Sequence, residues 1–536
     1  MKKKVLFIII IALTLSLISF YRNRNESLTV EAISFAQAQQ KTSANKSEIS
    51  IDGATIARFF KRYPSLQKYQ LDVNVLYQKR KFKPIWYDSK GLIEFANLLY
   101  AKINLLDEEG LNSHLPYKDK FDRIFDEKSA DELSQTDTEI MLSSVYVFYA
   151  QKVFHGMDTK KIQETGWFIP RKNFSYVNLL DSLLANPKLL SKNENLVFSQ
   201  YYKLRDVLKK YRQIEKEGGW NTVESISQAE ELKPNDSSKI IGQIRHWLTV
   251  NGDLKQDSKL NLYDNEMMAG ILNFKKRNGF KVNYSITYRH IWQMNIPVEE
   301  RIKTIMINME RCRWIDPKLD KANEYIIINI PSFNLIYKRN GKKELESNVF
   351  LGQIITETVV FSATMSRIVF SPYWNIPKSI IESELKVQMD RDKNYLAQHN
   401  IEWNNGNARQ KPGINNSLGL VKFVFPNSHD IYLHDTPAQS LFEMEYRTFS
   451  HGCINVNKAK ELAILILKDD PDWPIDRINN AMKGVKETTC VLKNKIPIHI
   501  GYFTAWVNDS DEICFYNDIY LRDDHLTELL FSEGPK

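Results

Sequence analysis

The sequence predicts a multidomain α+β protein, in which a helical scaffold and a small three-helix module precede a mostly antiparallel, β-sandwich-like domain with a capping insertion. The chain has 536 residues, which is too long for one ordinary domain. Its first half repeats apolar residues at helical spacing. From Tyr325 onwards, short runs of β-branched and aromatic residues alternate with turn signals, as strands do.

Helical patterns define two predicted domains before the sheet. Residues 51–235 are expected to form the scaffold, because apolar residues recur three and four apart in Thr138–Phe154, Leu179–Leu184 and Tyr201–Tyr211. Residues 236–310 are expected to form the three-helix module. Its helices are predicted at Ile240–Val250, Asp264–Arg277, which a glycine follows as a helix stop, and Arg289–Asn295, and a connecting helix is predicted at Glu299–Cys312.

Residues 320–525 are expected to form the β domain. Strands are predicted at Tyr325–Ile330, Phe333–Lys338, Glu346–Leu351, Ile368–Phe370, Val421–Phe425 and Ile431–Leu433. One clear helix, Asn457–Lys468, follows them. Residues 378–412 are a polar, partly helical insertion, which either covers a cleft as a lid or is an ordinary surface excursion.

The N-terminus predicts export. Within residues 1–24, three lysines precede an uncharged, nearly all apolar run from Val5 to Tyr21. This run is long for a signal peptide and slightly short for a membrane span of ~20 residues. The small-residue triplet Ala36–Ala38 lies too far downstream for typical cleavage, so we expect an uncleaved anchor with its lysines in the cytoplasm; a cleaved signal is the alternative. Residues 25–50 predict a flexible linker, and the rest of the chain is expected in the periplasm or on the periplasmic face of the inner membrane.

Composition limits the partners of the chain. The net charge of +8 is a mild excess of 73 basic over 65 acidic residues, and no dense basic stripe with interleaved aromatic residues occurs. This argues against nucleic acid as a partner. The four cysteines are too few for a disulfide scaffold and contain no Cys-x-x-Cys pair, so we expect no metal and no cofactor. Cys490 and Cys514 could form a disulfide in an oxidising compartment, but two buried free thiols are at least as well supported.

The candidate catalytic residues are concentrated in the hexapeptide Ser450–Asn455. Cys453 is the predicted nucleophile, because a neighbouring imidazolium lowers the pKa of a thiol, and His451 shares a face with Cys453 if the backbone is extended. Backbone N–H groups around Gly452 can point at an oxyanion, especially with a helix beginning nearby, and Ser450 can orient an imidazole. His434 reaches the same pocket if its strand neighbours that of Cys453, and it is then either a second base or a group that binds the substrate carbonyl. The sequence leaves open which histidine takes the proton.

The window from His434 to Asn455 resembles the signature of the L,D-transpeptidase (YkuD-type) catalytic domain: a histidine, a gap of some fifteen residues, then Ser/Thr-His-Gly-Cys, a hydrophobic residue and Asn or Arg. Further similarity to the large multidomain branch of this family occurs at residues 370–377, 422–427 and 502–506. That branch carries a helical scaffold, a peptidoglycan-binding-like module and a substrate-capping subdomain. The module here has Lys275 where the family has Gln and lacks an Asp-Gly turn, so a scaffold role is an alternative to glycan binding.

The resemblance implies a peptidoglycan L,D-transpeptidase. Cys453 would form a thioester on a stem tetrapeptide with release of D-Ala, and an amine of a second stem would resolve it to a 3→3 crosslink. The alternative is an L,D-carboxypeptidase or amidase-type cysteine hydrolase acting on stems or on protein–peptidoglycan links. Peptidoglycan stems and glycan are therefore the expected partners, and a carbapenem is expected to acylate Cys453. The candidate substrate-binding residues are Tyr373, Trp374, Tyr432, Arg447 and Asn455, for which core packing or ion pairing is the alternative role.

Overall fold

The computed structural model describes residues 49–126, 133–190 and 196–531. The predicted membrane segment, residues 1–24, lies outside these ranges, and no helix within them is long and apolar enough to cross a membrane. The chain divides into two compact units. Among the described residues, the first comprises 49–105, 114–126, 133–150 and 175–190, and the second comprises 106–113, 151–174 and 196–531.

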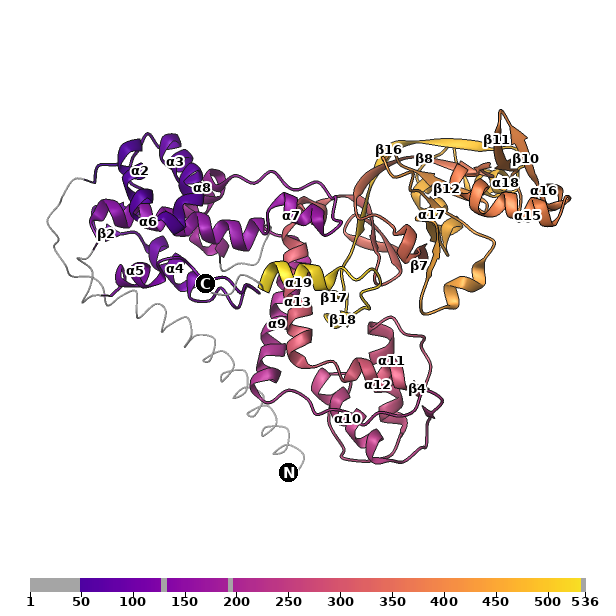
Figure 1. Ribbon diagram of the computed structural model, residues 1–536, viewed down its shortest axis with the longest axis horizontal. Coiled ribbons are helices and arrows are strands. Elements are labelled where there is room, and N and C mark those ends of the chain that lie inside the picture. Colours follow the sequence, from indigo (N-terminus) through magenta and orange to yellow (C-terminus); the bar gives the residue numbers. More distant parts are fainter. Residues whose placement is uncertain (1–48, 127–132, 191–195, 532–536) are drawn as a thin grey trace, which may run out of the picture. The chain divides into compact units, whose positions relative to one another are not determined.

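The first unit is mainly helical (Figure 1). Its elements are α2 (Gly53–Arg62), η1 (Pro64–Tyr69), α3 (Gln70–Lys79), β1 (Tyr87–Asp88), β2 (Gly91–Leu92), α4 (Glu94–Ile103), α5 (Lys118–Arg123), α6 (Gln135–Ala150), α8 (Tyr176–Ala185) and η3 (Pro187–Leu190). Helix α6 forms the centre, and its fully buried Glu139 accepts hydrogen bonds from the Tyr77 hydroxyl at 3.0 Å and the Trp86 amide at 3.1 Å. One carboxylate thereby fastens α3 and the segment before β1 to α6.

In the second unit, two long helices, α9 (Ser199–Lys216) and α13 (Val298–Arg313), pack against each other. Glu310 of α13 is buried, pairs with Arg313 at 2.9 Å and accepts the Trp314 indole N–H at 2.8 Å. Because each polar atom of this group finds a partner, α13 can lie inside the unit despite its charged residues. The short elements near these helices are η2 (Gln151–His155), α7 (Thr159–Glu164) and η4 (Pro317–Lys321).

The three-helix module has its own apolar core. It contains α10 (Lys239–Asn251), α11 (Asn265–Arg277), α12 (Tyr288–Met294) and the strand pair β3 (Glu231–Leu232) and β4 (Ile286–Thr287). Helix α11 begins where the Asp264 side chain caps the Met267 amide, and it stops before Gly279, whose φ of 73° is left-handed. The predicted local signals therefore coincide with the ends of this helix.

A nine-stranded sheet forms the C-terminal domain, and its order is β14-β7-β15-β13-β12-β8-β16-β5-β6 with an additional β7–β6 pairing. The strands are β5 (Glu324–Asn329), β6 (Asn334–Arg339), β7 (Lys342–Gly352), β8 (Ser362–Phe370), β12 (Val421–Val424), β13 (Leu433–His434), β14 (Thr448–Ser450), β15 (Ile454–Val456) and β16 (Thr488–Gly501). Strand β7 pairs with β6 through its first part and with β15 and β14 through its last part. The sandwich-like sheet therefore closes on itself.

Most strand pairs are antiparallel, but β13–β15, β14–β7 and β16–β5 are parallel. Two helices, α17 (Ala459–Leu467) and α18 (Ile475–Met482), follow β15. The sequence predicted only the first of them; α18 begins directly after Pro474, which is a regular helix-start signal. The remaining elements of the domain are η5 (Ile354–Thr356), η7 (Gln439–Glu443), β17 (Ala505–Val507), β18 (Ile513–Phe515) and α19 (Asp523–Phe531).

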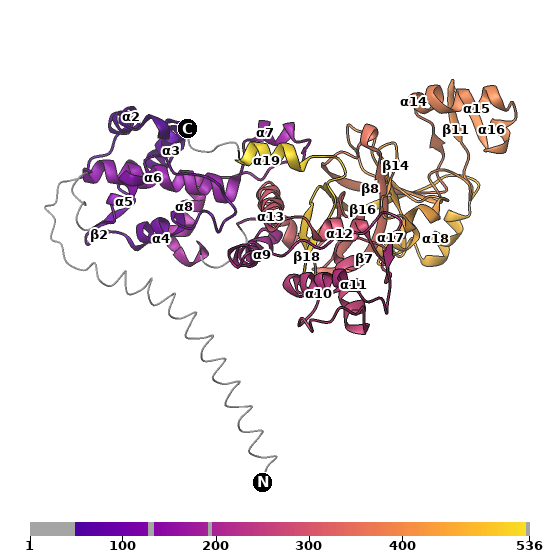
Figure 2. The ribbon, with the colours of Figure 1, turned by 60° about the horizontal axis from the view of Figure 1, so that its bottom comes forward.

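The insertion folds on itself as a small α/β cap (Figure 2). Its elements are β9 (Trp374–Asn375), α14 (Lys378–Ile380), η6 (Ile381–Leu385), α15 (Lys386–Arg391), α16 (Tyr395–Gln398), β10 (Ile401–Asn404) and β11 (Asn407–Gln410). Strands β10, β11 and β9 form a separate sheet, and Ile376, Ile381, Leu385 and Ala408 form its core. The cap therefore begins with Trp374, slightly before the predicted start at residue 378.

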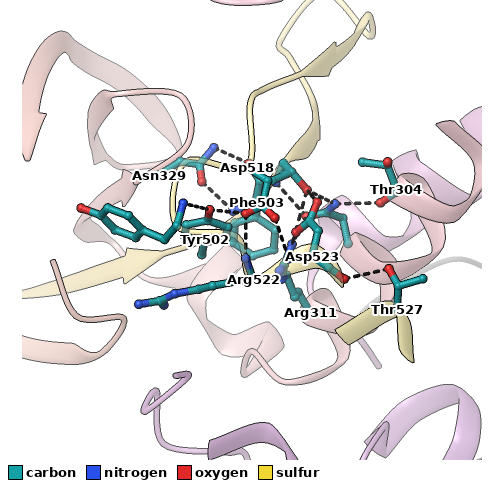
Figure 3. Close-up of polar contacts among 12 residues, drawn as sticks. Thr304, Arg311, Asn329, Tyr502, Phe503, Asp518, Arg522, Asp523 and Thr527 are labelled. Carbon is teal, nitrogen blue, oxygen red and sulfur yellow. Dashed lines mark hydrogen bonds and ion pairs between the residues drawn. The ribbon is translucent and has the colours of Figure 1, made fainter. Parts of the chain in front are cut away.

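A buried polar cluster joins α13 to the C-terminal segment (Figure 3). Arg311 pairs with Asp523 at 2.7 Å, and the Thr504 hydroxyl donates to Asp523 at 2.6 Å. The Asn329 side chain at the end of β5 accepts the Phe503 amide at 2.8 Å. These contacts fix residues 502–523 against both α13 and the sheet, and this segment in turn reaches the site described next.

Candidate active site

Strand register gathers the predicted site residues on one face of the sheet. His434 of β13 is paired with Lys422 of β12 and with Asn455 of β15. Paired residues point to the same face, and residues two apart in a strand do so too, so Tyr432 and Cys453 extend this row. The alternating residues, such as Phe423, Leu433 and Ile454, are buried in the core. The polar row therefore faces away from the core.

The Cys453 thiol lies against Tyr432. The Cys453 Sγ atom lies 3.7 Å from the Asp430 carbonyl oxygen. Burial raises the pKa of the thiol above its ordinary value, while the Tyr432 backbone N–H and hydroxyl and the nearby charge of Lys422 oppose this shift. The other three cysteines are buried and free, so Cys490 and Cys514 form no disulfide in the structure.

His434 is buried beside Tyr432, with a ring-centroid distance of 5.7 Å. Its Nδ1 atom lies 2.6 Å from the Asp435 carbonyl oxygen, which can only accept, so Nδ1 carries the proton and Nε2 keeps a free lone pair. Burial lowers the pKa of His434 to about 4. Together with the raised thiol pKa, this favours a neutral imidazole and a neutral thiol at rest.

The geometry places His451 differently from the prediction. Gly452 has a φ of 110°, so the backbone bends between His451 and Cys453, and strand alternation does not place these two side chains on one face. His451 is half exposed, and its Nε2 atom lies 2.9 Å from a Glu384 carboxylate oxygen on the cap. Within the described residues, the contacts of His451 thus lead to the cap, whereas those of Cys453 lead to Tyr432.

Residues 353–358 support the loop that carries Cys453. The buried Thr358 hydroxyl accepts the Gly352 amide at 3.0 Å and donates to the Gly452 carbonyl at 2.9 Å. The Tyr520 hydroxyl donates to the Gly352 carbonyl at 2.7 Å and accepts the Thr358 amide at 3.2 Å. The polar cluster of Figure 3 therefore extends through Tyr520 to the backbone beside the nucleophile.

Ser450 acts on backbone rather than on an imidazole. Its hydroxyl donates to the Cys453 carbonyl at 2.6 Å and accepts the Gly452 amide at 3.2 Å. The predicted helix follows at the far end of β15, roughly 10 Å of strand away from Cys453 at ~3.3 Å per residue. Its N-terminus is therefore too distant to serve an oxyanion at Cys453.

The candidate substrate-binding residues fall into two groups. Trp374 opposes the rise that burial causes in the pKa of Tyr432, and Tyr373 stacks under Arg409 of the cap at 4.2 Å, so these aromatic residues lie where the cap meets the site. Arg447, in contrast, is buried and donates to the backbone carbonyls of Met444 at 2.8 Å and Val349 at 3.2 Å. These contacts give Arg447 a structural role. Asn455 is buried next to His434 in the register.

Two residues of this site, Lys422 and Thr358, were not predicted from the sequence. The Lys422 Nζ atom lies 3.5 Å from the centroid of the Tyr432 ring. Thr358 holds the loop that carries Cys453, as described above. Lys422 could have been found from the strand alternation of residues 421–424, which points its side chain away from the apolar face. Thr358 carries no sequence signal, because its partners come from three separate segments.

Two segments of the chain match family models of known proteins. Residues 323–476 match the family model of the L,D-transpeptidase catalytic domain (YkuD), and residues 72–208 match a scaffold domain. A curated relative from Haemophilus influenzae, named as an L,D-transpeptidase, is 35% identical over 216 residues; the match covers 36% of this chain and 44% of the relative. The chain thus spans less than half of that relative's length.

Solved structures of similar proteins include an L,D-transpeptidase from Mycobacterium smegmatis, with 14% identity, a TM-score of 0.19, and coverage of 33% of this chain and 58% of the other. L,D-transpeptidase 3 from Mycobacterium tuberculosis gives 14% identity, a TM-score of 0.19, and coverage of 33% and 60%. At TM-scores this low, neither similarity supports a structural conclusion. The family matches confirm the resemblance and the predicted order of a helical scaffold before a β-rich catalytic domain.

Proposed function

We propose that the L,D-transpeptidase catalytic domain of this chain crosslinks peptidoglycan through a thioester on Cys453. The observation that carries the proposal is the arrangement of the thiol: it is partly exposed, lies beside Tyr432, which favours its ionised form, and is one strand away from a histidine with a fixed tautomer. A nucleophilic thiol needs a base and polar groups that support its charge. The family match supplies the class of reaction.

In the proposed first step, His434 Nε2 removes the thiol proton as Cys453 attacks the carbonyl carbon of the L-centre residue in a stem tetrapeptide. A carbon–sulfur bond forms, the amide bond to the terminal D-Ala breaks, and the proton passes from His434 to the departing amine. In the second step, an amine of another stem attacks the thioester, gives its proton to His434 and displaces the sulfur, which takes that proton back from His434. The product is a 3→3 amide crosslink.

The resting charges of His434 and Cys453 imply that the proton is transferred at the moment of attack. Burial lowers the pKa of His434 to about 4 and raises that of Cys453, so a preformed imidazolium–thiolate pair is disfavoured. General-base transfer contributes typically 10²–10⁴-fold to such a step. The Asp435 carbonyl keeps Nε2 available for this role. We therefore assign the base to His434 rather than to His451.

The cap supplies the substrate-facing wall in this proposal. Trp374 and Tyr373 lie at its root, and Glu384 on η6 reaches His451 beside the nucleophile. A stem peptide bound between these groups and Cys453 would be shielded from water, which favours an amine over hydrolysis. Asn455 and Tyr432 flank His434 in the row and complete the proposed binding surface.

We also propose that the N-terminal segment exports the chain to the periplasm, where peptidoglycan is built. The support is the lysine-led apolar run of residues 5–21. Mass spectrometry of the N-terminal peptide of the native protein tests whether this segment is retained.

Purified protein incubated with disaccharide tetrapeptides tests the function. The expected products are free D-Ala and crosslinked dimers whose tandem mass spectra show a 3→3 linkage, and Cys453→Ala should form neither. Tripeptides without dimers would overturn the transpeptidase assignment in favour of an L,D-carboxypeptidase. No reaction with tetrapeptides, combined with release of protein from peptidoglycan, would instead indicate an amidase-type hydrolase.

A further inference from the structure

A lysine lies beside the nucleophile without an ion-pair partner. Lys422 stands opposite His434 in the sheet, and its ammonium lies 3.5 Å from the centroid of the Tyr432 ring. Among the ion pairs of the described residues, none includes Lys422. A lysine is costly to bury unless its charge is compensated. The Tyr432 π face provides part of that compensation, because cations are attracted to aromatic rings at this distance.

Charges around Lys422 connect it to the thiol. The groups that face its ammonium are Cys453 and Glu487, with Arg367 and Asp430 contributing less. Burial lowers the pKa of Lys422, and the negative form of Cys453 is the strongest opposing influence. The positive charge of Lys422 likewise favours the ionised form of Cys453. The two groups therefore stabilise each other's charged states.

The Tyr432 side chain links the two groups physically. The ammonium lies over its ring, and its hydroxyl lowers the pKa of the Cys453 thiol. A cation over a phenol ring attracts electron density from it, which makes the hydroxyl a better hydrogen-bond donor. Hydrogen bonds to a charged acceptor are the stronger ones, so this effect acts mainly after the thiol has lost its proton.

We propose that Lys422 is a positioning residue of this site: its ammonium, held on the Tyr432 ring, makes the Tyr432 hydroxyl a stronger hydrogen-bond donor towards the Cys453 sulfur and stabilises the thiolate that attacks the substrate. The inference rests on Cys453 being the nucleophile of the proposed function. It assigns a cation, in addition to the histidine, to the step that generates the thiolate. It also gives Tyr432 a role in the chemistry besides substrate contact.

Alkylation of the full chain by iodoacetamide tests this without any transpeptidase substrate. The rate at Cys453 is followed by peptide mass spectrometry from pH 6 to 11, so that the three buried cysteines do not interfere. Lys422→Met should shift the midpoint upwards by about one pH unit, which is about a tenfold loss of thiolate at a given pH. Lys422→Arg should shift it much less, because the charge remains. Lys338→Met, a lysine of β6 in the same sheet, should leave it unchanged.

A double-mutant cycle with Tyr432→Phe separates action through Tyr432 from a direct effect. If Lys422 acts through the hydroxyl, the shift caused by Lys422→Met should shrink to less than half in the Tyr432→Phe background. Circular dichroism establishes that each variant folds, and Lys422→Gln replaces Lys422→Met if the latter does not. An unchanged midpoint in a folded Lys422→Met or Lys422→Gln protein overturns the proposal. Because alkylation needs no peptidoglycan, this result is independent of whether crosslinks form.

Discussion

Because the base is assigned to His434, the losses of rate caused by replacing His434 and His451 can be compared quantitatively. His434→Ala removes a buried imidazole whose Nε2 atom is free to accept a proton, and loss of a general base costs about 10²–10⁴-fold, or about 3–5 kcal/mol of transition-state stabilisation. His451→Ala removes a half-exposed pair with Glu384, in which 51% and 54% of the two side chains are accessible. Pairs this exposed contribute at most about 1 kcal/mol, or roughly fivefold.

The two variants should therefore differ by at least about twentyfold in the rate of acyl-enzyme formation. Single-turnover release of D-Ala from a disaccharide tetrapeptide measures that rate, and thermal unfolding of each variant shows whether the fold is retained. Added imidazole should partly restore His434→Ala, because the cavity left by the side chain lies beside Tyr432. The reasoning is refuted if His451→Ala is the slower variant, or if His434→Ala stays within fivefold of the unmodified protein.

Loss of the Thr358 hydroxyl in Thr358→Val should lower the free energy of unfolding by about 2–5 kcal/mol, because the buried Gly352 amide and Gly452 carbonyl lose their partner. Urea unfolding measures this, and Thr358→Ser, which keeps the hydroxyl, should lose far less. Stability should also fall as the pH drops from about 6.5 towards 4, since His434 has a pKa of about 4 in the fold and ~6.5 when unfolded, so the unfolded state binds the extra proton in this window. His434→Gln should remove that part of the pH dependence, and an unchanged slope would contradict the shift. A carbapenem should add its mass to the peptide that contains Cys453 and not to Cys453→Ala; adducts only on other cysteines would argue against this pocket.

The sequence predicts well the parts of the fold that depend on neighbouring residues. Helix α11 starts at the Asp264 cap and stops before Gly279, because both signals act within one turn of the helix. Strand β5 is likewise recognisable from its run of β-branched residues. The cysteine and its upstream histidine could be named as site residues because their spacing matches a family signature.

Features that depend on strand register or on backbone conformation could not be predicted from these local sequence signals. The expectation that His451 and Cys453 lie side by side assumed an extended backbone, whereas Gly452 takes a φ of 110°. The proximity of Lys422 to Tyr432 exists only because β12 pairs with β13 in one register. Arg447 could not be distinguished from a ligand-binding arginine, since its backbone partners belong to segments far away in the sequence.

Closure of the sheet has a consequence for the order in which the domain can be made. Ile326 of β5 pairs in parallel with Ile498 of β16, and β16 also pairs with β8, so the sheet cannot close before the last of its strands has emerged. At ~5–20 residues per second, synthesis of the stretch between Cys453 and Gly501 takes about 2–10 s. During that interval β5 and β8 lack the strand that pairs with both of them. The strands that flank Cys453 are therefore made before the strand that completes the sheet around them.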